Sequence, residues 1–178
     1  MMDETRELLT DRPAEDILRL RLNRPDRLNA INTPLVEALN MAFDGLDARA
    51  VVLDSSTPRA FCAGADLDLE DAERARVSDL LYELYEKMVR LPIPIVVAIN
   101  GDAVGGGAQL AIAGDLRVAG PLAKLRVAGP GHGLAVAAWA LPSLVGRGRA
   151  LDLCLTMREV GAEEALAIGL VERIEENP

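Results

Sequence analysis

A run of three glycines between an apolar segment and a helical one constrains this chain more than any other feature. The apolar residues 95–99 lead into Asn100-Gly101-Asp102-Ala103-Val104-Gly105-Gly106-Gly107-Ala108-Gln109, and the apolar residues 110–113 follow. This order predicts a buried strand, a glycine turn and a helix. Glycines at a helix start carry no Cβ, so an external group can approach main-chain N–H groups at the positive end of the helix dipole. The turn is therefore a candidate seat for an anion or a developing negative charge, and the alternative is a tight turn or close helix packing.

A second turn of small residues follows another predicted strand. The strand-like residues 51–54 precede Phe61-Cys62-Ala63-Gly64-Ala65-Asp66-Leu67, which again leaves backbone amides approachable. Two such turns can direct two N–H donors at one carbonyl oxygen, which is how an enolate or a tetrahedral oxyanion is stabilised without side chains. The two turns together favour a site of this kind over packing alone.

Strand and helix signals alternate along the chain. Residues 1–14 are polar and are expected to form a loose lead-in, and residues 18–22 alternate leucine with arginine as in a half-buried strand. Thr33-Pro34 predicts a helix start with Thr33 as the N-cap. Acidic residues over 68–73 are expected to begin a long helix that ends before Pro92, and residues 115–119 form a further short strand. The pattern predicts a single α/β domain over residues 1–178.

Composition excludes several classes of function. The chain is 50% hydrophobic and 26% charged, with 3% aromatic residues, so it can bury a core that must be aliphatic. A net charge of −9 argues against general binding to nucleic acid or to an anionic membrane. Cys62 and Cys154 have no metal-type spacing, no signal peptide is recognisable, and no apolar run approaches a membrane span. These features predict a reduced cytoplasmic protein.

Four motifs, in this order and spacing, resemble the enoyl-CoA hydratase/isomerase (crotonase) superfamily. They are Arg24-Pro25-Asp26-Arg27-Leu28-Asn29-Ala30, the turn 61–67, the glycine turn 100–107, and Gly161-Ala162-Glu163-Glu164-Ala165-Leu166-Ala167-Ile168-Gly169-Leu170-Val171. The resemblance runs from about Ile17 to Ile174 and implies a spiral of repeated ββα turns. It further implies an acyl-CoA thioester as substrate, with coenzyme A as part of that substrate, no separate cofactor and no metal.

The resemblance also assigns roles to residues. Ala65 N–H and Gly106 N–H match the two donors that hold the thioester carbonyl. The segments 27–30 and 63–67 match the stretches that line the CoA tunnel, and the implied substrate-binding residues are Arg27, Leu28, Ala30, Ala63, Gly64, Asp66, Leu67 and Gly105. Family members usually carry a further helical C-terminal region, most of which is not recognisable here, and a homo-oligomer, either a trimer or a dimer of trimers, is expected.

The chain departs from the family pattern at both catalytic glutamates. Gln109 stands at the first position, and the best match to the second is Gly129. Hydration needs one group to take the proton of water and one to protonate the α-carbon, and a glutamine has no titratable proton for this work. Ordinary hydratase activity is therefore not expected. His132, the only histidine, lies in the loop that would carry the second glutamate and could act as the base, or it is a surface residue.

Three other polar residues have simpler interpretations. Cys62 could pair with His132 as a nucleophile, but a small buried cysteine more often only packs. Asp66 and Asp102 are expected to cap or form turns. Three hypotheses remain: an enzyme-like protein that stabilises the enolate of a CoA thioester, a CoA-binding module without turnover, and a structural partner of another crotonase in which the glycines serve packing.

Overall fold

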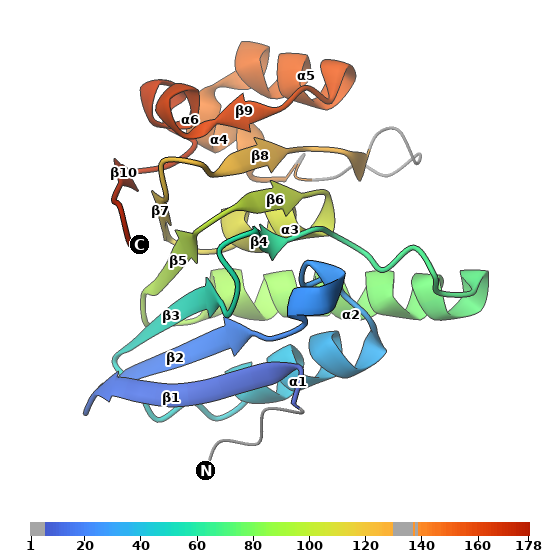
Figure 1. The fold of residues 1–178 in the computed structure, drawn as a ribbon, viewed down its shortest axis with the longest axis vertical. Helices are drawn as coiled ribbons and strands as arrows, with labels where there is room; N and C mark the ends of the chain where they lie inside the picture. Colours follow the sequence, from blue (N-terminus) through green and yellow to red (C-terminus); the bar gives the residue numbers. More distant parts are fainter. Residues whose placement is uncertain (1–5, 130–136, 138) are drawn as a thin grey trace.

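The computed structural model describes residues 6–129, 137 and 139–178, and within these the strands form two sheets (Figure 1). The larger sheet has six strands in the order β1 (Leu8–Ala14), β2 (Ile17–Leu22), β3 (Ala50–Ser55), β5 (Ile95–Ile99), β7 (Leu116–Ala119) and β10 (Arg173–Ile174). Its neighbours pair in parallel except for β1, which is antiparallel to β2. The smaller sheet has the order β4 (Ala60–Cys62), β6 (Asp102–Val104), β8 (Lys124–Arg126) and β9 (Val160–Gly161), with only β9 antiparallel.

Helices follow pairs of strands in a repeating order. The helices are α1 (Thr33–Phe43), α2 (Asp71–Arg90), α3 (Gly106–Ile112), α4 (Leu141–Val145), α5 (Arg147–Thr156) and α6 (Ala162–Ile168), with a 3-10 turn at Pro25–Arg27. The units β3-β4-α2, β5-β6-α3 and β7-β8-α4 each give one strand to the larger sheet and one to the smaller sheet. Figure 1 shows these turns stacked along the long axis, from β1 to α5 and α6. The predicted α/β spiral of ββα turns is confirmed.

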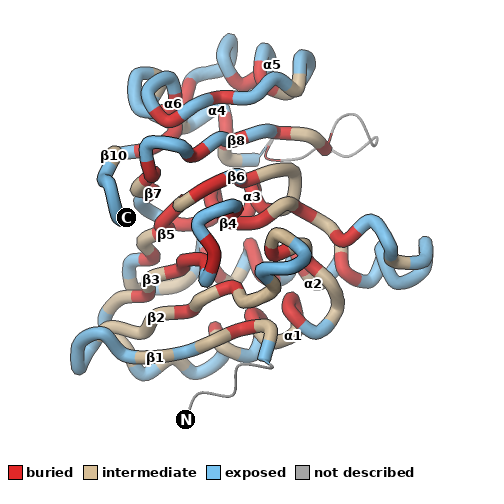
Figure 2. The backbone as a smooth tube through the Cα atoms, viewed as in Figure 1, coloured by how far each residue is buried: buried red, intermediate tan, exposed pale blue. Residues whose placement is uncertain are grey.

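The core is aliphatic, as the composition predicts. Buried residues line the central strands and the inner faces of the helices, whereas α5 and the outer side of α2 are largely exposed (Figure 2). In α2 the buried positions recur at helical spacing: Val77, Leu81, Leu84, Tyr85 and Met88. Helix α2 packs against α1, so both helices cover one side of the strands that lead into the two turns.

Four local expectations were wrong. The lead-in expected over residues 1–14 is a strand from Leu8 onward, because residues 8–11 and Ala14 pair with β2, and Leu8 is buried. The N-cap of α1 is Asn32, whose Oδ1 accepts a hydrogen bond of 3.1 Å from Leu35 N–H, and Thr33 is the first helical residue. Asp102–Val104, expected to be part of the glycine turn, is the strand β6. The acids before position 71 precede α2 and do not belong to it.

Candidate active site

The pairing of β4 with β6 brings the two small-residue turns together. These strands are parallel, with Cys62 opposite Ala103, so the segments that follow the two strands leave the sheet at the same edge. Three residues beyond each of these positions are Ala65 and Gly106. Register in the smaller sheet therefore places two stretches that are some forty residues apart in the sequence side by side.

The glycines of the two turns are not all glycine for the same structural reason. A Cβ at Gly107 would lie 2.2 Å from Cys62 O, and one at Gly64, which has φ +95°, would lie 2.7 Å from Val104 O. These two residues must be glycine because the turns pack against one another. A Cβ at Gly106 would meet nothing closer than 3.6 Å, so close packing does not explain this glycine. Close packing therefore explains why positions 64 and 107 are glycine, but it does not explain why position 106 is.

The backbone nitrogens of Ala65 and Gly106 lie near one another where the two turns meet. The Cβ position of Gly106 lies 3.8 Å from Ala65 N, and the Cβ position of Gly64 lies 3.5 Å from Gly106 N. The bridge of Ile31 with Ala65 uses the neighbouring groups of the second turn, since Gly64 O accepts from Ile31 N–H and Asp66 N–H donates to Ile31 O. Neither Ala65 N–H nor Gly106 N–H donates to an acceptor in the described part of the chain.

Each of these donors belongs to a peptide whose carbonyl already accepts a hydrogen bond. Gly64 O accepts from Ile31 N–H at 2.7 Å, and Gly105 O accepts from Gln109 N–H at 3.0 Å. A peptide polarised at its carbonyl is a better donor at its N–H, because hydrogen bonds in a chain strengthen one another. The two free N–H groups are therefore fixed in direction and strengthened as donors to a negative oxygen.

Ala65 and Gly106 both line a cleft of about 870 Å³. The following residues that were assigned roles from the sequence line this cleft: Ala63, Gly64, Ala65, Leu67, Gly105, Gly106 and Gln109. Arg27, Leu28, Ala30 and Asp66 lie outside the lining, and their assignment to substrate binding stays a prediction. His132 lies outside the described residues. Gly129, at the second glutamate position, lines the cleft as well.

Asp66 supports the 61–67 turn through hydrogen bonds and does not line the cleft. Its carboxylate accepts from Arg24 at 3.1 Å, from Arg27 at 3.0 Å and from Asp68 N–H at 3.2 Å. Burial opposes ionisation of this carboxyl, but the hydrogen bonds from Asp68 N–H and the two guanidinium groups outweigh it and lower the pKa of Asp66. The expected turn-forming role is confirmed, and the anion ties the 24–27 segment to the turn that carries Ala65.

Gln109 uses its side chain to hold another segment. It is 5% exposed, and its Oε1 accepts a hydrogen bond of 2.9 Å from the backbone N–H of Ala137. Ala137 is fully buried and has φ +58°, a conformation that alanine adopts only under constraint from its surroundings. The amide at this position is thus a structural acceptor at the wall of the cleft.

Cys62 is a packing residue. Its side chain is fully buried and its Sγ donates to Asn29 O at 3.1 Å. Burial raises the pKa of the thiol to about 12, so the thiolate needed for nucleophilic attack does not form near neutral pH. The expectation that Cys62 packs is confirmed, and a role as nucleophile is not supported.

Sequence reasoning missed the wall that α2 and β8 contribute to the cleft. Its aromatic residues are Tyr82 and Tyr85, and its cations are Arg74 and Arg126. In the sequence Tyr85 has the spacing of a core position, and it is indeed 3% exposed, yet its hydroxyl donates to Gly106 O at 3.0 Å. No local signal distinguishes such a tyrosine, because its acceptor comes from a different turn of the spiral.

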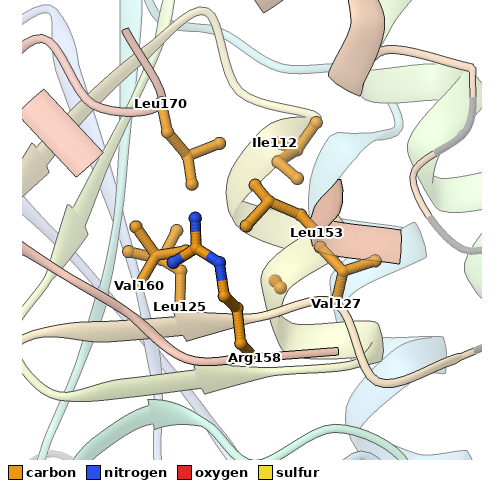
Figure 3. Close-up of a pocket in the computed structure, with 8 residues that line it drawn as sticks. Ile112, Leu125, Val127, Leu153, Arg158, Val160 and Leu170 are labelled. Atoms are coloured by element: carbon orange, nitrogen blue, oxygen red, sulfur yellow. The ribbon is translucent and has the colours of Figure 1, made fainter. Parts of the chain in front are cut away.

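A second cavity lies between α3 and the C-terminal segment (Figure 3). Its volume is about 10 Å³, its lining is mainly aliphatic, and Arg158 crosses it toward Leu170 and Val160. The guanidinium of Arg158 is held by Asp152 at 3.0 Å and Glu164 at 2.7 Å. A space of this size holds no more than about one water molecule, so it is a packing gap and not a ligand site.

Two kinds of feature are absent from the described residues. Among them, no three His, Cys, Asp or Glu side chains are grouped so that they could hold a metal ion. No helix in the described ranges combines the length and apolar character needed to cross a membrane.

The fold and the site define a class: α/β proteins of stacked ββα turns in which two turns of small residues line one cleft. The sequence profile of the enoyl-CoA hydratase/isomerase family matches residues 12–177. The chain is 46% identical over 168 residues to the probable enoyl-CoA hydratase echA6 of Mycobacterium bovis, and the alignment covers 90% of this chain and 68% of that protein. The chain therefore belongs to the enoyl-CoA hydratase/isomerase family.

Solved structures agree with this assignment. An enoyl-CoA hydratase from Bacillus anthracis superposes with a TM-score of 0.87 at 31% identity, covering 95% of this chain and 70% of that one. A monofunctional enoyl CoA isomerase from M. smegmatis superposes with a TM-score of 0.82 at 33% identity, covering 96% and 77%. Hydratases and an isomerase are thus both similar to this chain, so similarity alone does not select the reaction.

Proposed function

We propose that this protein binds an acyl-CoA thioester in the cleft and stabilises negative charge on the thioester oxygen with Ala65 N–H and Gly106 N–H. The observation that supports the proposal is that Ala65 and Gly106 line one cleft, while their N–H groups have no acceptor among the described residues and belong to polarised peptides. When a proton leaves the α-carbon, the electron pair moves into the carbonyl and the oxygen becomes an enolate anion. Two fixed donors stabilise this anion more than the neutral carbonyl, which is the condition for catalysis.

The identity of the residue at position 109 argues against simple hydration. Gln109 carries no titratable proton, and its Oε1 is engaged by Ala137 N–H. Gly129 offers no side chain at the second position. If turnover occurs, it requires one base near the α-carbon, and His132 remains the candidate from the sequence. A protein that binds the ester without turnover is the alternative that this arrangement also favours.

Two arginines compensate for the charge of the ligand. The chain carries a net charge of −9 and coenzyme A is itself anionic, so long-range repulsion opposes binding. Arg74 and Arg126 line the cleft and can contact phosphate groups, although Asp71 and Asp79 line it too. We therefore expect the affinity for the CoA ester to fall as salt concentration rises.

Calorimetric titration with acetyl-CoA and crotonyl-CoA tests the proposal without presuming a reaction. We expect micromolar binding by the wild-type protein. Ala65→Pro removes one N–H donor while leaving the cleft wall apolar, and we expect it to weaken binding of crotonyl-CoA while binding of free coenzyme A, which has no thioester carbonyl, is retained. Equal loss for both ligands, or no binding to a folded wild-type sample at millimolar ester, would contradict the proposal.

Turnover is tested separately with His132→Ala. If the wild-type protein converts a CoA ester, loss of activity with unchanged ester binding identifies His132 as the base. Turnover that survives the substitution removes it from that role, and an inactive wild-type protein that still binds the ester supports the binding module.

A further inference from the structure

We infer that Tyr85 is a positioning residue that fixes the Gly106 N–H donor through a hydrogen bond to the carbonyl of the same residue. This inference rests on the proposed function, because positioning of the donor has a consequence only if the donor meets a thioester oxygen. The carrying observation is the hydrogen bond of 3.0 Å from the Tyr85 hydroxyl to Gly106 O.

Gly106 needs such a constraint because its surroundings offer little steric guidance. It lies among three consecutive glycines, and the N-cap of α3, Gly105, has φ +54° and ψ −115° and no side chain to cap the helix. A backbone without Cβ atoms has more accessible conformations than any other. A donor must nonetheless be held within a fraction of an ångström to favour the charged oxygen over the neutral one.

Hydrogen bonds replace the missing side chains on both sides of the Gly106 Cα. The peptide before it is held by the hydrogen bond from Gln109 N–H to Gly105 O at 3.0 Å, and Gly105 itself is anchored by its N–H to Arg126 O at 2.9 Å. The peptide after it is held by the Tyr85 hydroxyl, which reaches across from α2. Tyr85 thereby ties the first residue of α3 to a helix of the preceding ββα unit.

The tyrosine is itself held on two sides. Its ring lies edge-on to Tyr82 at 6.0 Å and stacks with Trp139 at 6.4 Å and 27°. Trp139 follows shortly after Ala137, whose N–H donates to Gln109 in α3. Gly106 is thus hydrogen-bonded to Tyr85, and Tyr85 stacks with Trp139. Ala137, two residues before Trp139, is in turn hydrogen-bonded to Gln109 in α3.

The hydroxyl remains a donor under physiological conditions. Burial raises the pKa of Tyr85 well above its ordinary value, so the phenol stays protonated. Three of the five aromatic residues of the chain gather in this cluster, at the wall that faces the two turns.

The test uses the absorbance of cinnamoyl-CoA, whose conjugated thioester absorbs at longer wavelength when its carbonyl oxygen accepts strong hydrogen bonds. At saturating ligand, the wild-type protein is expected to shift the absorbance to longer wavelength. Tyr85→Phe keeps the ring and its stacking but removes the hydroxyl, and we expect it to bind the ester and lose most of the shift. Incorporation of para-aminophenylalanine at the same position returns a donor and is expected to restore the shift.

Tyr82→Phe is the matched control, because it removes a hydroxyl from the neighbouring ring and not from the bond to Gly106. At saturating ligand it is expected to keep the full shift. Trp139→Leu retains the Tyr85 hydroxyl and removes only the surface residue that stacks on the Tyr85 ring. It serves as the test variant if Tyr85→Phe does not fold. We expect it to lose part of the shift.

The two proposals fail in different ways. A full absorbance shift in Tyr85→Phe at saturating ligand overturns the positioning role and leaves the proposed function standing. If Tyr85→Phe is unfolded, a full absorbance shift in Trp139→Leu has the same meaning. Absence of binding or of any shift in the wild-type protein overturns the proposed function, and the positioning role falls with it.

Discussion

Gly106 and Gly107 are adjacent in the sequence but are glycine for different reasons. A methyl group on Gly107 would lie 2.2 Å from Cys62 O and 2.7 Å from Cys62 Cβ, whereas one on Gly106 would lie 3.6 Å from its nearest neighbours. We expect Gly107→Ala to lower the free energy of unfolding by about 3 kcal/mol, because the backbone of β4 cannot move aside. Gly106→Ala is expected to change it by less than about 1 kcal/mol. Urea unfolding of both variants measures the difference, and equal losses would contradict this packing.

The buried thiol of Cys62 makes stability depend on pH. Its pKa rises from 9.0 in the unfolded chain to about 12 in the folded protein, so the folded state holds the proton longer. The stability from this group is present below pH 9 and is lost as the pH rises from there toward 12. Between about pH 8 and pH 10 we expect the wild-type protein to lose about 1.4 kcal/mol more unfolding free energy than Cys62→Ala.

Chemical denaturation of both proteins at the two pH values gives this difference. Parallel losses in the wild-type protein and in Cys62→Ala would show that the thiol titrates normally in the folded state. Cys154 is half-buried and burial raises its pKa too, but it is present in both proteins and cancels in the comparison.

At the scale of the elements, the start of α1 offers a direct comparison of two neighbouring polar residues. Asn32 Oδ1 accepts from Leu35 N–H, whereas the hydroxyl of Thr33 donates to the exposed Glu73. We expect Asn32→Ala to cost about 1 kcal/mol, because a helix N–H loses its acceptor. Thr33→Ala is the control and is expected to stay within about 0.5 kcal/mol of the wild-type protein. A larger loss for Thr33→Ala in urea unfolding would restore Thr33 as the cap.

Elements with their own periodicity were predictable from the sequence. The leucine alternation of β2, the apolar run of β5 and the helical spacing in α2 are local patterns, and the structure confirms all three. Strand β6 was not predictable because its three residues have no pattern of their own. It exists because Asp102–Val104 pairs with β4 on one side and β8 on the other.

For the candidate site, the resemblance to the crotonase superfamily assigned the two N–H donors to Ala65 and Gly106, and the structure brings the turns that carry these residues to one cleft. The assignment of the donors stays a prediction. The Tyr85 hydroxyl bond and the acceptor role of Gln109 were not visible, because each joins residues from different ββα units. Contacts between units depend on how the spiral stacks, and no local pattern encodes that.

For the whole molecule, exposed apolar side chains lie at both ends of the stack of ββα turns. Leu155 on α5 is 76% exposed and Met41 on α1 is 75% exposed, and Figure 1 places α5 and α1 at opposite ends of the stack. Leu151, one helical turn before Leu155 on α5, is also exposed, as is Leu166 on α6. Because extended apolar surface favours association, we expect a homo-oligomer that uses the α5–α6 end.

Sedimentation of the wild-type protein is expected to give a mass of three times the 19.0 kDa chain. Leu155→Lys places a charge in the expected interface and should shift the mass toward the single chain, because a buried unpaired charge is costly. Met41→Lys makes the same change at a residue of equal exposure on the other end and should leave the mass unaltered. A wild-type protein that sediments as a monomer would contradict the expectation, and a loss of assembly in Met41→Lys alone would move the interface to the α1 end.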